Sequence, residues 1–335
     1  GNGRMYVAEM RTYMQNIDGS GKFDKVSRVS RHEDTNGDGH FDQHTVFADN
    51  LLLPRIVLPL KDTVVIGETN TLDLYEYHDT DGDGVSDHRT LWFKGGPRGG
   101  NLEHQPSGLI WALDNWLYAT YNDFRLRYTP EGVIREEIPA NTGQWGITQD
   151  SSGRVWNVNA GKETGPVHFQ THTLYGHFEF EDEQVDGYKT VWPTANIPDT
   201  QGGIGQLRED NTLNHFTATC GPDIFRGDRL PADLRGDLIF AEPVGRLIRR
   251  TKINEVAGVT QLSNAYHQDE FIRTTDPLFR PINQVTAPDG TLYIVDMYRG
   301  IIQEGNWTRE GSYLREQILA HDLEKEIGLG RIYRL

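Results

Sequence analysis

Short runs of alternating apolar and polar residues, separated by turns rich in Gly, Asn and Asp, recur along the chain of 335 residues. In the clearest case, Leu109–Leu113 and Trp116–Thr120 predict two strands, and Asp114-Asn115 predicts the turn between them. Comparable hairpins are expected at 145–156 and 282–293, and the second strand alone recurs at 4–9, 63–68 and 237–242. A sheet unit that recurs every ~40 to 85 residues predicts a β-propeller.

The segments between these units complete the predicted blades. The remaining expected strands are Lys25–Val29, Thr45–Ala48, Leu72–Tyr77, Thr90–Phe93, Asp237–Ala241, Leu247–Arg250 and a closing strand at Gly330–Leu335. Leu314, Ile318 and Leu319 have helical spacing, which predicts a short amphipathic helix over Ser312–His321. The expected fold class is all-β: a six-bladed β-propeller with a short C-terminal helix, forming a single domain over residues 1–335.

Six polar side chains stand at equivalent points of the six repeated strands, three residues after a large apolar residue. If these strands are the innermost ones, the six side chains form a ring at one mouth of the central channel. The ring consists of Glu9, Glu68, Tyr121, Asn159, Glu242 and Asp296. It fits either a water-filled tunnel or a functional site, and in the second interpretation these residues shape a cofactor site.

Two acidic loops, at 34–42 and 79–87, share the pattern Asp-x-Asx-x-Asp-Gly-x-x-Asp and form an internal repeat with the strands that follow them. The pattern offers side-chain oxygens at positions 1, 3, 5 and 9, a backbone carbonyl at position 7 and a turn at the Gly in position 6. Hard oxygen ligands at this spacing favour Ca²⁺. The predicted ligands are Asp34, Asn36, Asp38, the carbonyl of His40 and Asp42 in the first loop, and Asp79, Asp81, Asp83, the carbonyl of Val85 and Asp87 in the second.

These loops depart from an EF-hand, because position 12 is Thr45 or Thr90 rather than Glu and the flanking segments are strands. We therefore expect shortened, structural calcium sites. The alternative is a pair of acidic turns that bind no metal. Repulsion among three or four carboxylates within nine residues argues against that alternative.

Charge and cysteine content restrict the function classes. The formal net charge is -16, which argues against binding to nucleic acid or to anionic membrane surfaces. Cys220 is the only cysteine, so the chain has no intrachain disulfide and no Cys-x-x-Cys-His haem attachment. The longest apolar run, Leu51–Leu60, is too short to span a membrane. No signal peptide is visible, and the chain begins directly in strand-like sequence, as a processed chain would.

The region 161–205 is the least periodic part of the chain and contains His168, His172 and His177. A His-x3-His pair could bind a transition metal on a helix, but Thr171, Thr173 and the nearby Gly disfavour a helix here. Cys220 fits a buried small residue better than a nucleophile.

Several motifs, taken in order, resemble a known family. They include Gly-Arg-Met-Tyr-Val-Ala-Glu-Met-Arg, the second acidic loop, Thr-Cys-Gly-Pro-Asp-Ile-Phe-Arg-Gly-Asp and Gly-Arg-Ile-Tyr-Arg-Leu. Together they resemble the propeller domain of large secreted bacterial proteins labelled membrane-bound dehydrogenases or haem-binding proteins of planctomycete type. The resemblance implies one domain of a longer protein, a periplasmic or secreted location, and a cytochrome c domain as electron acceptor.

The chain is more distantly similar to the soluble aldose and sorbosone dehydrogenases that depend on pyrroloquinoline quinone (PQQ), which are six-bladed propellers holding PQQ and Ca²⁺. Their catalytic base is a His in a His-x-x-Gly-x-Leu context. The stretch Glu103-His104-Gln105-Pro106-Ser107-Gly108-Leu109 matches loosely, and the resemblance therefore implies that His104 is the base.

The chain departs from these dehydrogenases where they place an Arg that holds the quinone, since Gln144 or Trp145 stands at that point. Arg11, Arg226 and Arg299 are candidate substitutes. Two hypotheses follow: a PQQ-dependent oxidoreductase that acts on a sugar or alcohol, and a non-catalytic, calcium-stabilised binding or assembly module in a larger redox or cell-surface complex. A hydrolase or lyase that uses paired carboxylates is a third alternative.

Overall fold

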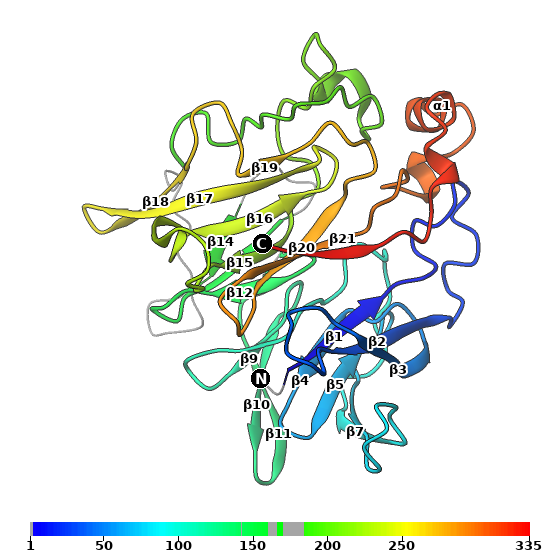
Figure 1. Cartoon of the computed structure of the whole chain (residues 1–335), viewed down its shortest axis with the longest axis vertical. Helices are drawn as coiled ribbons and strands as arrows, with labels where there is room; N and C mark the ends of the chain where they lie inside the picture. The colour runs from blue at the N-terminus through cyan, green and yellow to red at the C-terminus, as the bar shows by residue number, and fades with distance from the viewer. Residues whose placement is uncertain (1–2, 142, 160–165, 170–183) are drawn as a thin grey trace. The chain divides into compact units, whose positions relative to one another are not determined.

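The structure, a computed structural model, describes residues 3–141, 143–159, 166–169 and 184–335 (Figure 1). Within these residues the chain is all-β, with 22 strands, one α-helix and four short 3-10 helices. The chain divides into two compact units, of which the first comprises residues 1–13 and 20–140 and the second 14–19 and 141–335. Among the described residues, no helix is both long and apolar enough to cross a membrane.

The first unit contains three antiparallel sheets, which follow one another along the chain. The first sheet has the order β1 (Arg4–Glu9), β2 (Ser27–Glu33), β3 (Gln43–Leu51). The second has the order β4 (Ile56–Pro59), β5 (Thr63–Gly67), β6 (Leu74–His78), β7 (His88–Phe93). The third consists of β8 (Ile110–Trp111), β9 (Leu117–Tyr118), β10 (Phe124–Thr129) and β11 (Gly132–Glu137).

The second unit also contains three antiparallel sheets. They comprise β12 (Ile147–Gln149), β13 (Val155–Val158) and β14 (Pro166–Phe169); β15 (Cys220–Ile224), β16 (Leu238–Glu242), β17 (Leu247–Val256), β18 (Val259–Asn264) and β19 (Ile272–Arg273); and β20 (Pro281–Thr286), β21 (Leu292–Asp296) and β22 (Arg331–Arg334). The expected closing strand is β22, which pairs with β21. The 3-10 helices are Gly203–Gln206, Ala232–Leu234, Gly305–Trp307 and Leu323–Lys325.

The expected all-β class, the propeller arrangement and the short helix are confirmed. The expected six-bladed arrangement is not confirmed: among the described residues, three of the sheets have three strands, two have four and one has five. The helix α1 (Tyr313–Ala320) begins where the sequence predicted, because the Ser312 hydroxyl accepts a hydrogen bond from the Arg315 amide at 3.3 Å. Leu314 and Ile318 are buried, whereas Leu319 is exposed.

Apolar residues fill the space between successive sheets within each unit. In the first unit, Val29 and Phe47 of the first sheet pack with Val64 and Ile66 of the second. A second cluster joins the β4–β7 sheet to the β8–β11 sheet through side chains that include Phe93 and Phe124, whose ring centroids lie 5.8 Å apart. In the second unit, Ile239, Ile248, Leu292 and Ile294 belong to one cluster between the β15–β19 and β20–β22 sheets.

The order of strands corrects one premise of the sequence analysis. Five of the six repeated strands, β5, β9, β13, β16 and β21, are flanked by a partner on both sides, so they are not the innermost strands. The edge positions that precede them belong to β4, β8, β12, β15 and β20. Within the second unit, β15 contacts both β12 and β20, as innermost strands of neighbouring blades do. Only β1, which lies at a sheet edge and contacts β4, fits the expected position.

Candidate functional site

His104 lies in the loop between β7 and β8 and is exposed. Its imidazole stacks on the ring of Tyr121, with 5.5 Å between the ring centroids and 10° between the planes. Tyr121 has a φ of 53°, in the left-handed region that an aromatic residue rarely adopts. Strained backbone of this kind persists only where the surrounding structure holds it, and such positions gather at functional sites.

The residues beside His104 fix its backbone. The buried side chain of Gln105 donates a hydrogen bond to the Asn70 side-chain oxygen at 2.8 Å and accepts one from the Asn70 amide at 2.7 Å. The buried guanidinium of Arg55 donates to the carbonyls of Leu102 and Gln105. Burial lowers the pKa of Arg55 to about 10. These contacts hold the His104 loop against the β4–β7 sheet.

An arginine that the sequence analysis did not single out lies against the same aromatic ring. The Arg98 guanidinium carbon is 5.7 Å from the centroid of Tyr121, and the Arg98 amide donates to the Asn70 carbonyl at 2.9 Å. The Nε of Arg98 is buried and has no hydrogen-bond partner among the described residues. An unpartnered buried donor is costly, so Nε of Arg98 would gain from a hydrogen-bond acceptor.

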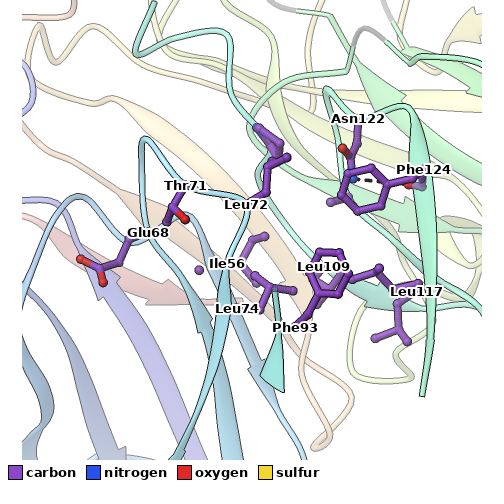
Figure 2. A pocket seen from close by; sticks show the side chains of 14 residues that line it. Ile56, Glu68, Thr71, Leu72, Leu74, Phe93, Leu109, Leu117, Asn122 and Phe124 are labelled. Atoms are coloured by element: carbon purple, nitrogen blue, oxygen red, sulfur yellow. Dashed lines mark hydrogen bonds between the residues drawn. The ribbon is translucent and has the colours of Figure 1, made fainter. Parts of the chain in front are cut away.

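An apolar recess in the first unit lies between the β4–β7 and β8–β11 sheets. Figure 2 shows Ile56, Leu74, Phe93 and Leu109 gathered around it. Polar lining residues are Glu68, Thr71 and Asn122, and Asn122 directly follows Tyr121 in the chain. Most of its lining residues belong to the apolar cluster that joins the two sheets, so the recess is a small gap in the core of this unit.

In three of the six predicted ring residues, the carboxylate accepts hydrogen bonds from backbone amides. The Glu68 carboxylate accepts from the Leu52 amide at 2.6 Å, and that of Glu242 accepts from the amides of Thr217 at 3.0 Å and Ala218 at 2.9 Å. The Asp296 carboxylate accepts from the Arg280 amide at 2.7 Å. In each case the amide lies just before the first strand of the sheet. We call these contacts strand-end ties.

The other ring residues have different surroundings. Glu9 pairs with Arg28 of the neighbouring strand at 2.8 Å, Asn159 is buried, and Tyr121 stacks with His104. Burial raises the pKa of Glu242 and that of Asp296. Glu9, Glu68 and Tyr121 belong to the first unit and Asn159, Glu242 and Asp296 to the second, so neither unit by itself contains the whole ring.

The second acidic loop joins β6 to β7 and brings three of its predicted ligands together. One carboxylate oxygen from each of Asp79, Asp81 and Asp83 lies within 4.8 Å of the others. The Asp79 carboxylate also accepts from the amides of Gly82 at 2.7 Å and Gly84 at 3.0 Å, which sets its orientation. This geometry matches a loop whose side chains converge on a divalent cation.

The first acidic loop joins β2 to β3 and repeats the same backbone pattern. The Asp34 carboxylate accepts from the amides of Gly37 at 2.7 Å and Gly39 at 2.8 Å, and Asn36 and Asp38 each accept from the amide two residues later. The backbone carbonyls of His40 and Val85 were predicted as the ligands at position 7. Within the described part of the chain, neither carbonyl accepts a hydrogen bond.

The position-9 carboxylates bind within their own loops. Asp42 accepts from the Thr35 hydroxyl at 2.6 Å, and Asp87 accepts from the Thr80 hydroxyl at 2.5 Å. These hydroxyl hydrogen bonds are the main reason that the pKa of Asp42 and that of Asp87 are lowered. Position 9 therefore closes the loop by bonding to position 2.

Arg31 of β2 connects the first sheet to the second acidic loop. Its buried guanidinium donates to the Asp79 carboxylate at 2.7 Å and to the Glu33 carboxylate at 2.6 Å. The Thr45 hydroxyl of β3 also donates to the Gly84 carbonyl at 3.0 Å. The Ser86 amide of the loop donates to the Phe47 carbonyl of β3 at 2.8 Å. The second loop thus rests on the first sheet through one ion pair and two hydrogen bonds.

The remaining candidate residues of the sequence analysis make contacts within the fold. Cys220 is buried, burial raises the pKa of its thiol, and its sulfur lies 3.9 Å from the Pro281 carbonyl. Arg226 donates to the carbonyls of Ile224 and Gln149, and Arg299 is buried. Arg11 is exposed, and its amide donates to the Ser27 hydroxyl. Gln144 is buried, and its amide donates to the Val158 carbonyl, while the Trp145 carbonyl accepts from the Gly221 amide. His172 and His177 lie outside the described residues, and His168 lies in β14.

The described structure defines the protein as an all-β chain of propeller type. Residues 1–335 match the family described as "Domain of unknown function (DUF7133)", and the chain belongs to this family. A comparison with curated protein sequences finds no match.

Several solved structures are distantly similar. The apo soluble aldose sugar dehydrogenase of Escherichia coli shares 11% identity, with a TM-score of 0.48 over 88% of this chain and 96% of that one. A luciferin-regenerating enzyme shares 9% identity, with a TM-score of 0.49 over 90% and 91%. A glucose dehydrogenase-like oxidoreductase of Thermus thermophilus shares 13% identity, with a TM-score of 0.44 over 86% and 89%. Similarities this distant assign no activity or cofactor to the chain.

Proposed function

We propose that the chain is a calcium-binding β-propeller that forms one domain of an extracytoplasmic oxidoreductase acting on a sugar or alcohol, with PQQ as its cofactor and a cytochrome c as its electron acceptor. The observation that carries the catalytic part is the arrangement of His104, Tyr121 and Arg98: an exposed imidazole and a guanidinium against one aromatic ring. The three groups suit a planar, anionic ligand.

The roles follow from the chemistry of each group. When bound, PQQ supplies a two-electron acceptor for the carbon that bears the hydroxyl. The imidazole of His104 takes the hydroxyl proton as the general base. The guanidinium of Arg98, which lies against Tyr121, holds a carboxylate of the cofactor and replaces the arginine that the sequence lacks at Gln144 or Trp145.

The test is to titrate the purified, chelator-treated chain with PQQ in the presence of Ca²⁺ and to screen sugars and alcohols by dye reduction. We expect binding with turnover. His104→Ala should abolish turnover and leave PQQ bound, whereas Arg98→Gln should weaken PQQ binding by about tenfold or more, as the loss of a charge-assisted hydrogen bond does. His267→Ala, at an exposed histidine in the other unit, is the matched control. The absence of PQQ binding to the wild-type chain would refute the oxidoreductase proposal.

Calcium binding rests on the convergence of Asp79, Asp81 and Asp83 and on the repeat of the loop at Asp34–Asp42. Chelation should lower the melting temperature, and Asp83→Ala should reduce that effect because one of the two sites is lost. Asp62→Ala, at an exposed aspartate outside the loops, is the control. A melting curve that excess chelator leaves unchanged would contradict calcium binding.

An extracytoplasmic location is proposed on the same basis, because weak calcium sites fill where the ion is abundant, as in extracellular modules. A full-length gene that encodes no export signal would contradict it.

A non-catalytic binding or assembly module is the second candidate. It is favoured by the contacts that join the second acidic loop to the first sheet, Arg31 to Asp79 and Thr45 to Gly84. An ion bound in this loop would stabilise the packing of the loop on that sheet. Under this alternative, chelation lowers the melting temperature but the chain neither binds PQQ nor reduces the dye with any substrate.

A further inference from the structure

The two acidic loops differ at one of the four positions whose side chains are predicted ligands. Position 3 is Asn36 in the loop at 34–42 and Asp81 in the loop at 79–87, whereas positions 1, 5 and 9 are Asp in both. The first loop therefore presents three carboxylates at these positions where the second presents four. In each loop the residue at position 3 is followed by Gly.

Asn36 and Gly37 form an Asn-Gly pair on the surface of the first unit. Both residues are exposed, and Gly37 has a φ of 76°, in the left-handed region that glycine adopts readily. A Cβ atom at Gly37 would meet no atom within 4 Å apart from those of its chain neighbours. The backbone nitrogen of Gly37 is therefore not shielded by a side chain of its own or by packing around it.

Two hydrogen bonds set the conformation of this pair. The Asn36 side-chain oxygen accepts from the Asp38 amide at 2.9 Å, an Asx turn that folds the carboxamide back towards the backbone of Gly37. The Gly37 amide donates to the Asp34 carboxylate at 2.7 Å. The turn thus gathers a carboxamide carbon, a backbone nitrogen and a carboxylate that can accept the proton of that nitrogen.

We propose that Asn36 is a site of intramolecular deamidation, which converts the first acidic loop to the ligand set of the second. The backbone nitrogen of Gly37 bonds to the side-chain carbonyl carbon of Asn36, and ammonia leaves with the proton that this nitrogen loses. Water then opens the cyclic imide. Opening at the side-chain carbonyl leaves aspartate in a normal backbone, and opening at the backbone carbonyl leaves isoaspartate, which adds one methylene to the main chain. Water is the sole co-reactant.

The two products have opposite effects on the loop. Aspartate adds the carboxylate that the second loop already has at position 3, and calcium affinity rises with the number of charged ligands. Isoaspartate lengthens the main chain inside the turn, so the ligands no longer converge. Bound Ca²⁺ slows the reaction, because the ion holds the Asp34 carboxylate and the Asn36 oxygen in place. These calcium effects rest on the proposed calcium binding, whereas the deamidation itself does not.

The test is to incubate the purified full chain at neutral pH, in chelator or in excess Ca²⁺, and to follow each asparagine by peptide mass spectrometry. Asn36 should be converted well before Asn115, which is also exposed but is followed by Trp. Gly37→Ala should slow the conversion by about tenfold or more, because a side chain obstructs the attack and disfavours this φ. An Asn36 that stays intact in chelator, or reacts no faster than Asn115, would overturn the proposal.

A calcium titration tests the consequence for the first loop separately. In an Asp83→Ala background, which disables the second loop, Asn36→Asp should bind Ca²⁺ about tenfold more tightly than its parent, because one more carboxylate faces the ion. An unchanged or weaker calcium affinity would overturn the claim that deamidation completes the ligand set. Deamidation of Asn36 at one rate with and without Ca²⁺ would support the modification and count against calcium binding at this loop.

Discussion

Asp199 carries a charge that folding removes almost completely from water. Its carboxylate lies between the guanidinium groups of Arg246, at 2.9 Å, and Arg280, at 2.5 Å, and all three side chains are at most 2% exposed. We expect Asp199→Asn to lower the free energy of unfolding by about 3 kcal/mol, because it leaves two buried guanidinium groups without a counter-charge. Denaturant unfolding at neutral pH measures the change.

The control for that variant is Asp62→Asn, which removes an ion pair with Lys61 whose side chains are 77% and 92% exposed. Its effect should be at most about 0.5 kcal/mol, because exposed pairs contribute little. Equal losses in the two variants would show that burial does not determine the contribution of the Asp199 cluster.

The same carboxylate makes stability depend on pH. Burial opposes its ionisation, but the charges of Arg280 and Arg246 prevail and lower the pKa of Asp199 to about 2. A lowered pKa stabilises the fold fully above the unfolded-state pKa, near 3.8, and this contribution disappears as the pH falls towards 2. The difference in unfolding free energy between wild type and Asp199→Asn should therefore shrink by about 2 kcal/mol from pH 5 to pH 2. A constant difference would contradict the assignment.

The sequence indicates the position of some residues at the candidate site and gives no signal for others. His104 was singled out through its loose resemblance to a family motif, and its catalytic role stays a prediction; its contact with Tyr121 appears only in the structure. Arg98 was missed because it lies in a Gly-rich stretch with no motif, and only folding brings it to Tyr121. The roles of Glu68 and Glu242 could not be predicted, because their amide partners are 16 and 25 residues away.

The contact between the first sheet and the second acidic loop can be tested as a pair. Arg31 is 4% exposed and Asp79 is 10% exposed, so their ion pair is shielded from solvent. A double-mutant cycle with Arg31→Met and Asp79→Asn, measured by urea unfolding in chelator, should give a coupling energy of about 1–3 kcal/mol. The cycle of Arg334→Met and Asp289→Asn, a more exposed pair, is the comparison and should couple less. A coupling energy near zero for Arg31 and Asp79 would show that the loop is held by other contacts.

The sequence predicted the strands well, but it did not predict their order within the sheets. Alternating patterns and turn residues identify strands locally, and those signals carry no information on the order of strands. Prolines provide the signal that could have corrected this. Pro59, Pro222 and Pro281 all lie in edge strands, β4, β15 and β20, because proline cannot donate a hydrogen bond to a second neighbour.

The excess of negative charge acts on the molecule as a whole. With a formal net charge of -16, the folded chain is destabilised by repulsion that salt can screen. In chelator, raising NaCl from about 20 mM to about 500 mM should raise the melting temperature by a few degrees. The rise should be smaller with Ca²⁺ present, because bound ions already offset part of the charge. A melting temperature that falls with salt would contradict this explanation.

The repeat predicted the propeller class but not the regularity of its sheets. Strand number per sheet depends on outer strands such as β14 and β22, which are only four residues long and so give a weak pattern in the sequence. The two compact units, with three sheets each, have no boundary signal in the sequence, since Asn141 follows Ala140 without a change in composition.

The strand-end ties bear on how this family can diversify. Each tie joins the second strand of a sheet to the residue that leads into the first, so the register of a sheet is secured within that sheet. Of the chain that connects one sheet to the next, only the residues just before the first strand take part in a tie. The rest of such a connection can therefore change in length without rebuilding the sheets. The carboxylates of Glu68, Glu242 and Asp296, which the sequence analysis placed in a polar ring, thus hold the strand ends while the connections vary.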